Sequence, residues 1–197
     1  MTAQDIKNSI LQLAVQGKLV PQNPNDEPAS ELLKRIKAEK QKLIKEGKIK
    51  KDKIQSEIYF DADNIPYEKR GSETVCIKDE FPFEIPQGWE LCRLREVCFL
   101  LDGEKYIGDS LPYLEAKVIR RLKAPEERNN GRFVNSNTTV ILVDGENSGE
   151  VFTTHCAGIL GSTFKVLHIL NSIYKDYILT IIRTTTSKNL RLCFAFL

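Results

Sequence analysis

The sequence has little that would support membrane insertion, secretion or a disulfide-stabilised fold. No stretch of the 197 residues approaches the ~20 apolar residues that a membrane-spanning helix needs. The first twenty residues lack the long apolar run and small-residue cleavage site of a signal peptide. The cysteines are odd in number and scattered, namely Cys76, Cys92, Cys98, Cys156 and Cys193. These absences predict a cytoplasmic protein in a reducing compartment, with no membrane partner.

The usual signatures of catalysis and metal binding are also missing. The two histidines, His155 and His168, lie in apolar stretches that look like strands, and no triad signature accompanies them or Cys156. No Cys-x-x-Cys pair suggests a zinc site. The segment DGENSG, residues 144–149, lacks the Lys-Ser/Thr ending of a phosphate-binding loop and is typical of a hairpin turn. The sequence therefore predicts neither a catalytic site nor a bound metal.

Charge is concentrated in one segment. The formal net charge is only +2, yet residues 30–53 carry ten basic and four acidic side chains. Nine of the ten basic residues are lysines, whereas a helix that contacts base edges is expected to carry more arginine and asparagine. We therefore interpret the segment as a solvated helix, or one that pairs with another helix, and direct DNA binding is the alternative.

Apolar spacing predicts two helices in the N-terminal part. The first covers residues 5–16, and Gly17 suits its C-terminal end. Ser30 is predicted to cap the second helix, which should end near Gly47. A narrow apolar seam on this charged helix is a candidate subunit interface, formed by Leu32, Leu33, Ile36, Leu43 and Ile44.

The rest of the chain favours strands and turns. Residues 54–80 are acidic and turn-rich, which predicts a linker with a short strand at 74–77. Residues 140–143 and 151–154 form the clearest hairpin pattern, and residues 173–183 have helical spacing. The expected fold is α+β, with a helical arm at 1–53, the linker at 54–80, and a mixed, mainly β domain with short helices at 81–197.

The segment YLEAKVIRRLKAPEERNNGRF, residues 113–133, combines six basic residues with aromatic residues at both ends. Such a composition can contact phosphates and bases, and a solvated loop is the alternative. The residues alone thus indicate an α+β protein with a helical arm and a possible DNA-binding surface.

Three stretches, in their order and spacing, resemble the specificity subunit of type I restriction–modification enzymes. ILQLAVQGKLVPQNPNDEPASELLKRIKAEKQKLIKEGKIKK, residues 10–51, resembles the family's spacer helix and the loop before it. FEIPQGWELCRLREV, residues 83–97, is similar to the entry into a target recognition domain. VILVDGENSGEVF and GILGSTF, residues 140–152 and 158–164, resemble paired strands late in such a domain.

The resemblance implies a non-catalytic subunit that recognises double-stranded DNA. Such subunits normally carry two target recognition domains and two spacer helices, which pair antiparallel as a coiled coil. Two modification subunits methylate adenine with S-adenosylmethionine, and restriction subunits cleave DNA with ATP. The chain itself would bind no cofactor, and S-adenosylmethionine, ATP and Mg²⁺ would belong to these partner subunits. The lysine-rich helix would then be a strut that docks the modification subunit.

The chain departs from that pattern because it has room for only one recognition domain and ends in the apolar sequence LCFAFL. A truncated or frame-shifted half-subunit is expected, and a natural domain ending in such a strand is the alternative. A half-subunit could recognise a bipartite site as a homodimer or beside another specificity chain. Three other hypotheses stay open: an inactive recombination remnant, a helical scaffold protein that does not bind DNA, and an enzyme acting alone.

Loops of the recognition domain are predicted to contact DNA, because the side chains of the strands are needed to form the core. They come from LDGEKYIGDS, from AKVIRR, from the hairpin turn and from the Gly-Ser-Thr turn with the lysine beyond it. The predicted DNA-binding residues are Lys105, Tyr106, Lys117, Arg120, Arg121, Asn147, Ser148, Ser162, Thr163 and Lys165.

Overall fold

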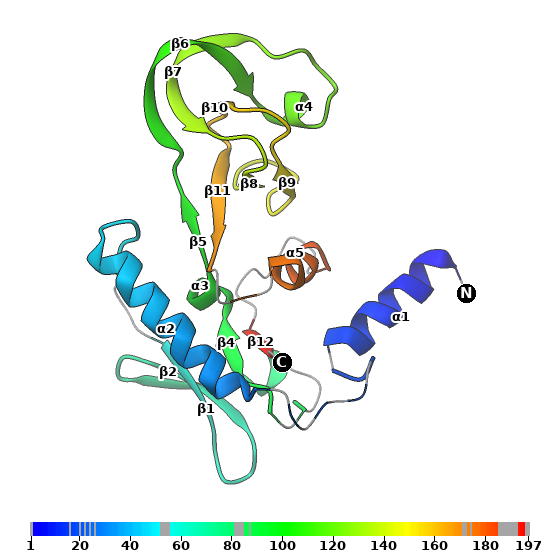
Figure 1. The fold of residues 1–197 in the computed structure, drawn as a ribbon. Coiled ribbons are helices and arrows are strands. Elements are labelled where there is room, and N and C mark those ends of the chain that lie inside the picture. Colours follow the sequence, from blue (N-terminus) through cyan, green and yellow to red (C-terminus); the bar gives the residue numbers. More distant parts are fainter. Residues whose placement is uncertain are drawn as a thin grey trace. The chain divides into compact units, whose positions relative to one another are not determined.

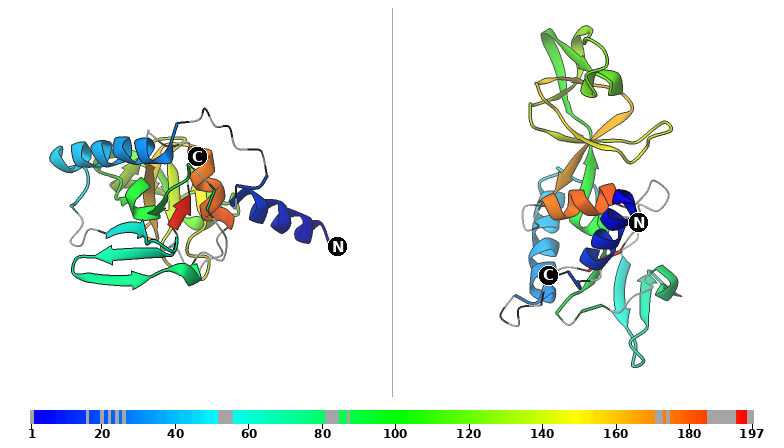
Figure 2. Two further views of the ribbon diagram at one scale, coloured as in Figure 1. Left: turned by 90° about the horizontal axis from the view of Figure 1, so that it is seen from below. Right: turned by 90° about the vertical axis from the view of Figure 1, so that its right-hand side faces the viewer.

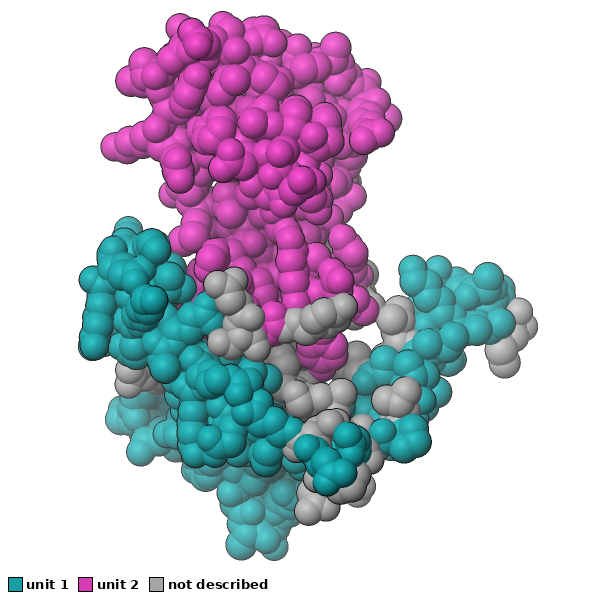
Figure 3. All heavy atoms as spheres, viewed as in Figure 1, with its two compact units in different colours: residues 1–97, 191–197 teal, residues 98–190 magenta. Residues whose placement is uncertain are grey.

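The chain divides into two compact units in its computed structural model, residues 1–97 with 191–197 and residues 98–190 (Figures 1 and 3). The structure describes all residues except 1, 16, 20, 22, 24, 26, 52–55, 81–84, 87, 171–172, 174, 185–192 and 196–197. The described residues form five α-helices and twelve β-strands, which confirms the predicted α+β fold.

The two N-terminal helices are α1, Ala3–Val15, and α2, Ala29–Lys45. Each is followed by a glycine in the left-handed conformation, Gly17 at φ 65° and Gly47 at φ 70°, as the sequence predicts. The predicted cap at Ser30 is wrong, since α2 begins one residue before it. Ala29 is fully buried, and its N–H donates to the carbonyl oxygen of Gly88 at 3.0 Å, which fixes the earlier start.

The apolar seam of α2 packs within residues 1–97. Ile36 is only 1% exposed, and the other four seam residues are half-buried. Helix α2 packs against the short helix α3, Leu94–Val97, and the ammonium of Lys40 lies 2.7 Å from the carboxylate of Glu96. The centre of the seam is therefore covered by the chain itself, and the role of the seam as a subunit interface stays a prediction.

Three strands occupy the segment that the sequence predicts as a linker. Strands β1, Ser56–Phe60, β2, Pro66–Arg70, and β3, Glu73–Cys76, form an antiparallel sheet in that order, followed by a 3₁₀ helix at Lys78–Glu80. The sequence predicted a strand only near β3. Strand β2 was missed because its most buried side chain, Glu68, is a carboxylate, which hides the apolar alternation of a half-buried strand.

The core of this unit lies around Trp89. Ile77, Trp89 and Leu91 are buried together. Strand β4, Leu91–Arg93, leads into α3 and pairs antiparallel with β12, Cys193–Ala195. The spacing of Leu91, Leu94, Val97 and Cys98 by itself predicts a short amphipathic helix, whereas the structure places strand β4 at Leu91 and begins the helix at Leu94.

Among the described residues of 98–190, eight elements precede the last helix. They are β5 Cys98–Leu101, β6 Glu104–Leu114, α4 Ala116–Ile119, β7 Glu127–Val134, β8 Thr139–Leu142, β9 Val151–Thr153, β10 Gly158–Leu160 and β11 Phe164–Ile169. Helix α5, Lys175–Thr184, follows them and confirms the predicted helix.

These strands form two sheets (Figure 2). One has the order β5-β11-β8-β9 with antiparallel neighbours, and its β8–β9 pair confirms the predicted hairpin. In the other, β6, β7 and β10 close on one another, with β10 parallel to β6 and antiparallel to β7. The core between them is centred on Leu114, Val140 and Phe164, which are fully buried. None of the described helices is both long and apolar enough to cross a membrane.

Candidate nucleic-acid interface

Strands β6 and β7 form a long two-stranded ribbon (Figure 1), and most of the residues in its outer half are exposed. Lys105 lies opposite Arg132, and Ile107 lies opposite Asn130. Opposed residues of an antiparallel pair share a face, and alternate residues of one strand share it too. The ribbon therefore presents these four side chains on one face. Ile107 is 91% exposed, and Gly108–Ser110 bulge out directly after it.

The other face of the ribbon packs inward and holds the strands in place. The rings of Tyr106 and Phe133 stack with their centroids 5.6 Å apart. Gly131 has a φ of 140°, and a Cβ atom there would lie 2.5 Å from Ile159 Cγ2. Only glycine fits this approach of β7 to β10. The exposed face is thus mounted on a rigid support.

The structure corrects the prediction that Lys105 and Tyr106 lie on a loop, since both lie within β6. Gly108 sits in the bulge, and Pro112 lies where the strand continues beyond it. Lys105 is exposed. Tyr106 is half-buried, and its hydroxyl donates to the carbonyl oxygen of Asp109 at 3.3 Å.

The basic residues after β6 differ in their surroundings. Lys117 is exposed on α4, and Arg121 is exposed directly after the helix, at φ 60°. Arg120 is half-buried, donates a hydrogen bond to the carboxylate of Glu150, and lies 5.4 Å from the centre of the Phe152 ring. Arg120 therefore packs against its own chain, whereas its two basic neighbours point charge into solvent.

Two turns carry the predicted polar residues. Asn147 and Ser148 lie in the β8–β9 turn, where the N–H of Ser148 donates to the carbonyl oxygen of Gly145 at 3.1 Å. Ser162 and Thr163 lie in the β10–β11 turn, and the carbonyl oxygen of Thr163 accepts from the N–H of Val143 at 2.8 Å. The backbone thus holds both turns, and the exposed side chains of Asn147 and Ser162 face solvent.

Lys165 is paired inside its unit. It lies on β11, and its ammonium is 2.6 Å from the Asp102 carboxylate, which also accepts from Arg132 at 3.0 Å. The hydrogen bonds from Lys165 and Arg132 hold the pKa of Asp102 below its usual value. Arg132 donates further to the carbonyl oxygens of Gly161 and Phe164. One carboxylate thus pairs with both cations and leaves this group with a net charge of +1, and Arg132 ties the ribbon to the turn beside it.

Seven basic residues of this unit thus fall into two groups. Arg120, Lys123, Arg132 and Lys165 form ion pairs. Lys105, Lys117 and Arg121 are exposed and form no ion pair with any described residue. Unpaired, solvated cations can meet a phosphate without first losing a carboxylate partner, so the second group is the better set of phosphate contacts.

Ile107 and Asn130 were not among the predicted site residues. Asn130 is exposed on β7, and its amide donates to the side-chain oxygen of Asn129 at 3.1 Å. A signal was present in the sequence, because neighbouring asparagines in the run ERNNGR carry the amides that pair with adenine edges. Only the strand register shows that Asn130 shares a face with Lys105 and Ile107.

The residues considered for catalysis are not assembled into a site. His155 and Cys156 lie in the loop between β9 and β10, not in a strand as the apolar neighbours suggested, and His168 lies on β11. Burial raises the pKa of the Cys98 thiol to about 12, so this thiol is not reactive at neutral pH. Within the described part of the chain, no three His, Cys, Asp or Glu residues are grouped as metal ligands.

Comparison with known proteins finds partial similarity to one class of protein. No family model matches the chain. It is 45% identical over 115 residues to the type I restriction enzyme EcoAI specificity subunit of Escherichia coli, a match covering 58% of this chain and 16% of that protein. It is 50% identical over 98 residues to the EcoEI specificity subunit of E. coli, covering 50% and 14%. The MjaVIII specificity subunit of Methanocaldococcus jannaschii is 30% identical over 109 residues, covering 50% and 25%.

The chain is thus a relative of type I restriction enzyme specificity subunits, which confirms the resemblance. The matches span at most a quarter of the length of these proteins. Among solved structures, the HsdS subunit of Thermoanaerobacter tengcongensis aligns with a TM-score of 0.42 and 19% identity, over 57% of this chain and 34% of that one. A chain of a type I R-M system structure aligns with a TM-score of 0.38 and 14% identity, over 92% and 40%.

Proposed function

We propose that this chain recognises a DNA sequence for a type I restriction–modification complex and directs the modification and restriction subunits to it. Its similarity to three specificity subunits supports this role. In this proposal the chain is not itself an enzyme. Adenine methylation with S-adenosylmethionine, and cleavage with ATP and Mg²⁺, take place on the partner subunits.

The observation that carries the proposal is the exposed face of the β6–β7 ribbon. A two-stranded ribbon fits the major groove of B-DNA, which is about 12 Å wide. The Asn130 amide can donate to and accept from an adenine edge, and Ile107 can contact a thymine methyl group. Lys105, on the same face, can contact a phosphate.

Lys117 and Arg121 add sequence-independent attraction beside the ribbon. Both are exposed and unpaired among the described residues, so DNA phosphates can neutralise them and release counterions. The ribbon would then determine which DNA sequence is bound, and these cations would increase the affinity for any DNA sequence.

Helix α2 has a different role in the proposal. Its half-buried seam residues Leu32, Leu33, Leu43 and Ile44 keep apolar surface available for a second helix. That helix would belong to a modification subunit, to a second copy of this chain, or to another specificity chain. The many lysines of α2 keep the helix solvated until it pairs.

The proposal is tested by expressing the chain with a type I modification subunit in a host that lacks DNA methylation. Single-molecule sequencing then maps N6-methyladenine across the genome. We expect a new methylated motif, and we expect Asn130→Ala to relax or abolish one position of it. Asn8→Ala, an exposed amide change on α1, is the matched control and should leave the motif unchanged. A co-purifying complex that methylates no defined motif would refute sequence recognition.

A further inference from the structure

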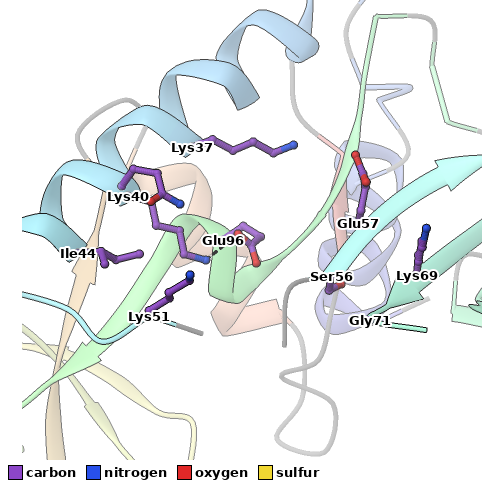
Figure 4. Close-up of a pocket in the computed structure, with 10 residues that line it drawn as sticks. Lys37, Lys40, Ile44, Lys51, Ser56, Glu57, Lys69, Gly71 and Glu96 are labelled. Atoms are coloured by element: carbon purple, nitrogen blue, oxygen red, sulfur yellow. Dashed lines mark hydrogen bonds and ion pairs between the residues drawn. The ribbon is translucent and has the colours of Figure 1, made fainter. Parts of the chain in front are cut away.

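Residues 1–97 contain a cavity that the ribbon face does not use. It has a volume of about 400 Å³ and lies between α2 and the β1–β2 pair (Figure 4). Six of its lining side chains are charged, and they come from separate elements of this unit: Lys37, Lys40, Lys51, Glu57, Lys69 and Glu96.

The charges of the cavity do not balance. Lys40 is 6% exposed and pairs with Glu96 at 2.7 Å, so these two charges cancel. The three remaining lysines are exposed and form no ion pair with a described residue, which leaves Glu57 as the one opposing charge among the six. The lining therefore has a formal charge of +2.

The three unpaired lysines do not form a single charged helix face. Lys37 comes from α2, Lys51 from the segment that follows it, and Lys69 from β2. Ammonium groups brought to one cavity repel one another, and an anion bound among them relieves that repulsion. Figure 4 shows the three around the cavity, together with the Lys40–Glu96 pair.

We propose that this cavity binds phosphate, and that in the DNA complex the phosphate belongs to the DNA backbone. The inference rests on the proposed DNA-recognition function. Lysine binds phosphate as a compact point charge with three donors, as the lysine of a phosphate-binding loop does. None of the described residues that line the cavity is an arginine. Contacts of lysine with phosphate carry no sequence information, which fits a phosphate of the DNA backbone.

A backbone site of this kind adds affinity without sequence preference. Each phosphate contact made by a cation contributes about 0.9 to the slope of log affinity against log salt concentration. Removing three such cations should reduce that slope by roughly two to three, whatever the DNA sequence. The motif chosen by the ribbon should not change.

The test compares two triple variants of the full chain with equal change in charge. The cavity variant is Lys37→Gln, Lys51→Gln and Lys69→Gln. The control is Lys7→Gln, Lys45→Gln and Lys78→Gln, three exposed lysines of the same unit that do not line the cavity and form no ion pair with a described residue. Binding of a random-sequence duplex is measured from 50 to 300 mM salt, and pyrophosphate is titrated without DNA while NMR shifts are followed.

In the cavity variant we expect the slope of log affinity against log salt concentration to fall by two to three in magnitude, and the NMR shifts caused by pyrophosphate to disappear. In the control variant we expect the slope to change by less than one and the NMR shifts to remain. Equal slopes in the two variants would overturn the backbone assignment. Pyrophosphate binding with equal slopes would assign the cavity to a free phosphate compound instead. Loss of the methylated motif with the slope difference intact would count against the proposed sequence recognition and not against this site.

Discussion

The guanidinium of Arg93 on β4 donates to the carboxylate of Glu68 on β2, and both side chains are at most 5% exposed. The guanidinium of Arg70 and the hydroxyl of Ser56 donate to the same carboxylate. The guanidinium of Arg93 also donates to the carboxylate of Glu80. The contact joins strands of two different sheets. A network of charged and polar side chains therefore holds the β1–β3 sheet against strand β4.

This network predicts a loss of stability in acid. Burial by itself would raise the pKa of Glu68, but hydrogen bonds from Arg93, Arg70 and Ser56 outweigh burial and lower it from 4.5 to about 2. In the window between these values the unfolded chain binds more protons, so stability falls as the pH falls from about 4.5 to 2. The loss should be of the order of 3 kcal/mol, measured by urea unfolding across that range.

The control for acid sensitivity is Glu73→Gln, which removes an exposed carboxylate of the same sheet. This variant should keep the acid sensitivity of the parent chain, whereas Glu68→Gln should remove most of it. Equal pH dependence in Glu68→Gln and the parent chain would assign the effect to other carboxylates.

The same pair predicts strong coupling in a double-mutant cycle. Glu68→Gln leaves the buried Arg93 paired with Glu80, and Arg93→Met leaves the buried Glu68 with Arg70 and Arg95. Each single change should cost up to about 3–5 kcal/mol. The double variant leaves neither charge and should cost clearly less than the two single losses combined. Urea unfolding of the four proteins gives the coupling energy. Additive losses would show that the two side chains stabilise the unit independently.

A side chain at position 17 is expected to lower stability through a steric clash, in addition to the strain of the left-handed backbone. A Cβ atom there would lie 2.6 Å from Pro86 Cγ and 2.9 Å from a ring carbon of Trp89. Gly17→Ala should therefore destabilise the unit by more than Gly47→Ala. At Gly47 the φ is similar but the space is open, so the cost is only about 1–2 kcal/mol of left-handed strain. Thermal unfolding followed by Trp89 fluorescence measures both, and equal losses would show that Trp89 can move aside.

Helices and the hairpin were predictable because their signals are local. Helix α2 ends at Lys45, just before Gly47, and β8 pairs with β9 across a turn of polar and glycine residues, so each is specified within about twenty residues of sequence. Strand β2 was not predictable in this way. Its buried residue Glu68 is stabilised by Arg93, which lies 25 positions further along the chain.

The candidate interface shows the same limit more sharply. Composition identifies the basic residues, but it does not show which of them are already paired. Lys165 is paired with Asp102, 63 positions away, and Arg120 with Glu150, 30 positions away. Ile107 and Asn130 acquire a shared face only through the register of β6 and β7. Sequence patterns give residue types, and long-range pairing decides which of them are free to act.

The difference between paired and unpaired cations predicts that neighbouring basic residues contribute differently to DNA binding. Lys105→Gln and Arg121→Gln should each lower the salt slope of DNA binding by about 1, with stability unchanged within about 0.5 kcal/mol. Arg120→Gln should change the slope less, because Glu150 already neutralises that charge, and should cost up to about 1 kcal/mol of stability. Anisotropy titrations of a labelled duplex from 50 to 300 mM salt, with urea unfolding of each variant, measure both effects. If Arg120→Gln lowers the slope as much as Arg121→Gln, Arg120 leaves Glu150 when DNA binds, and pairing within the free protein does not decide which cations contact phosphate.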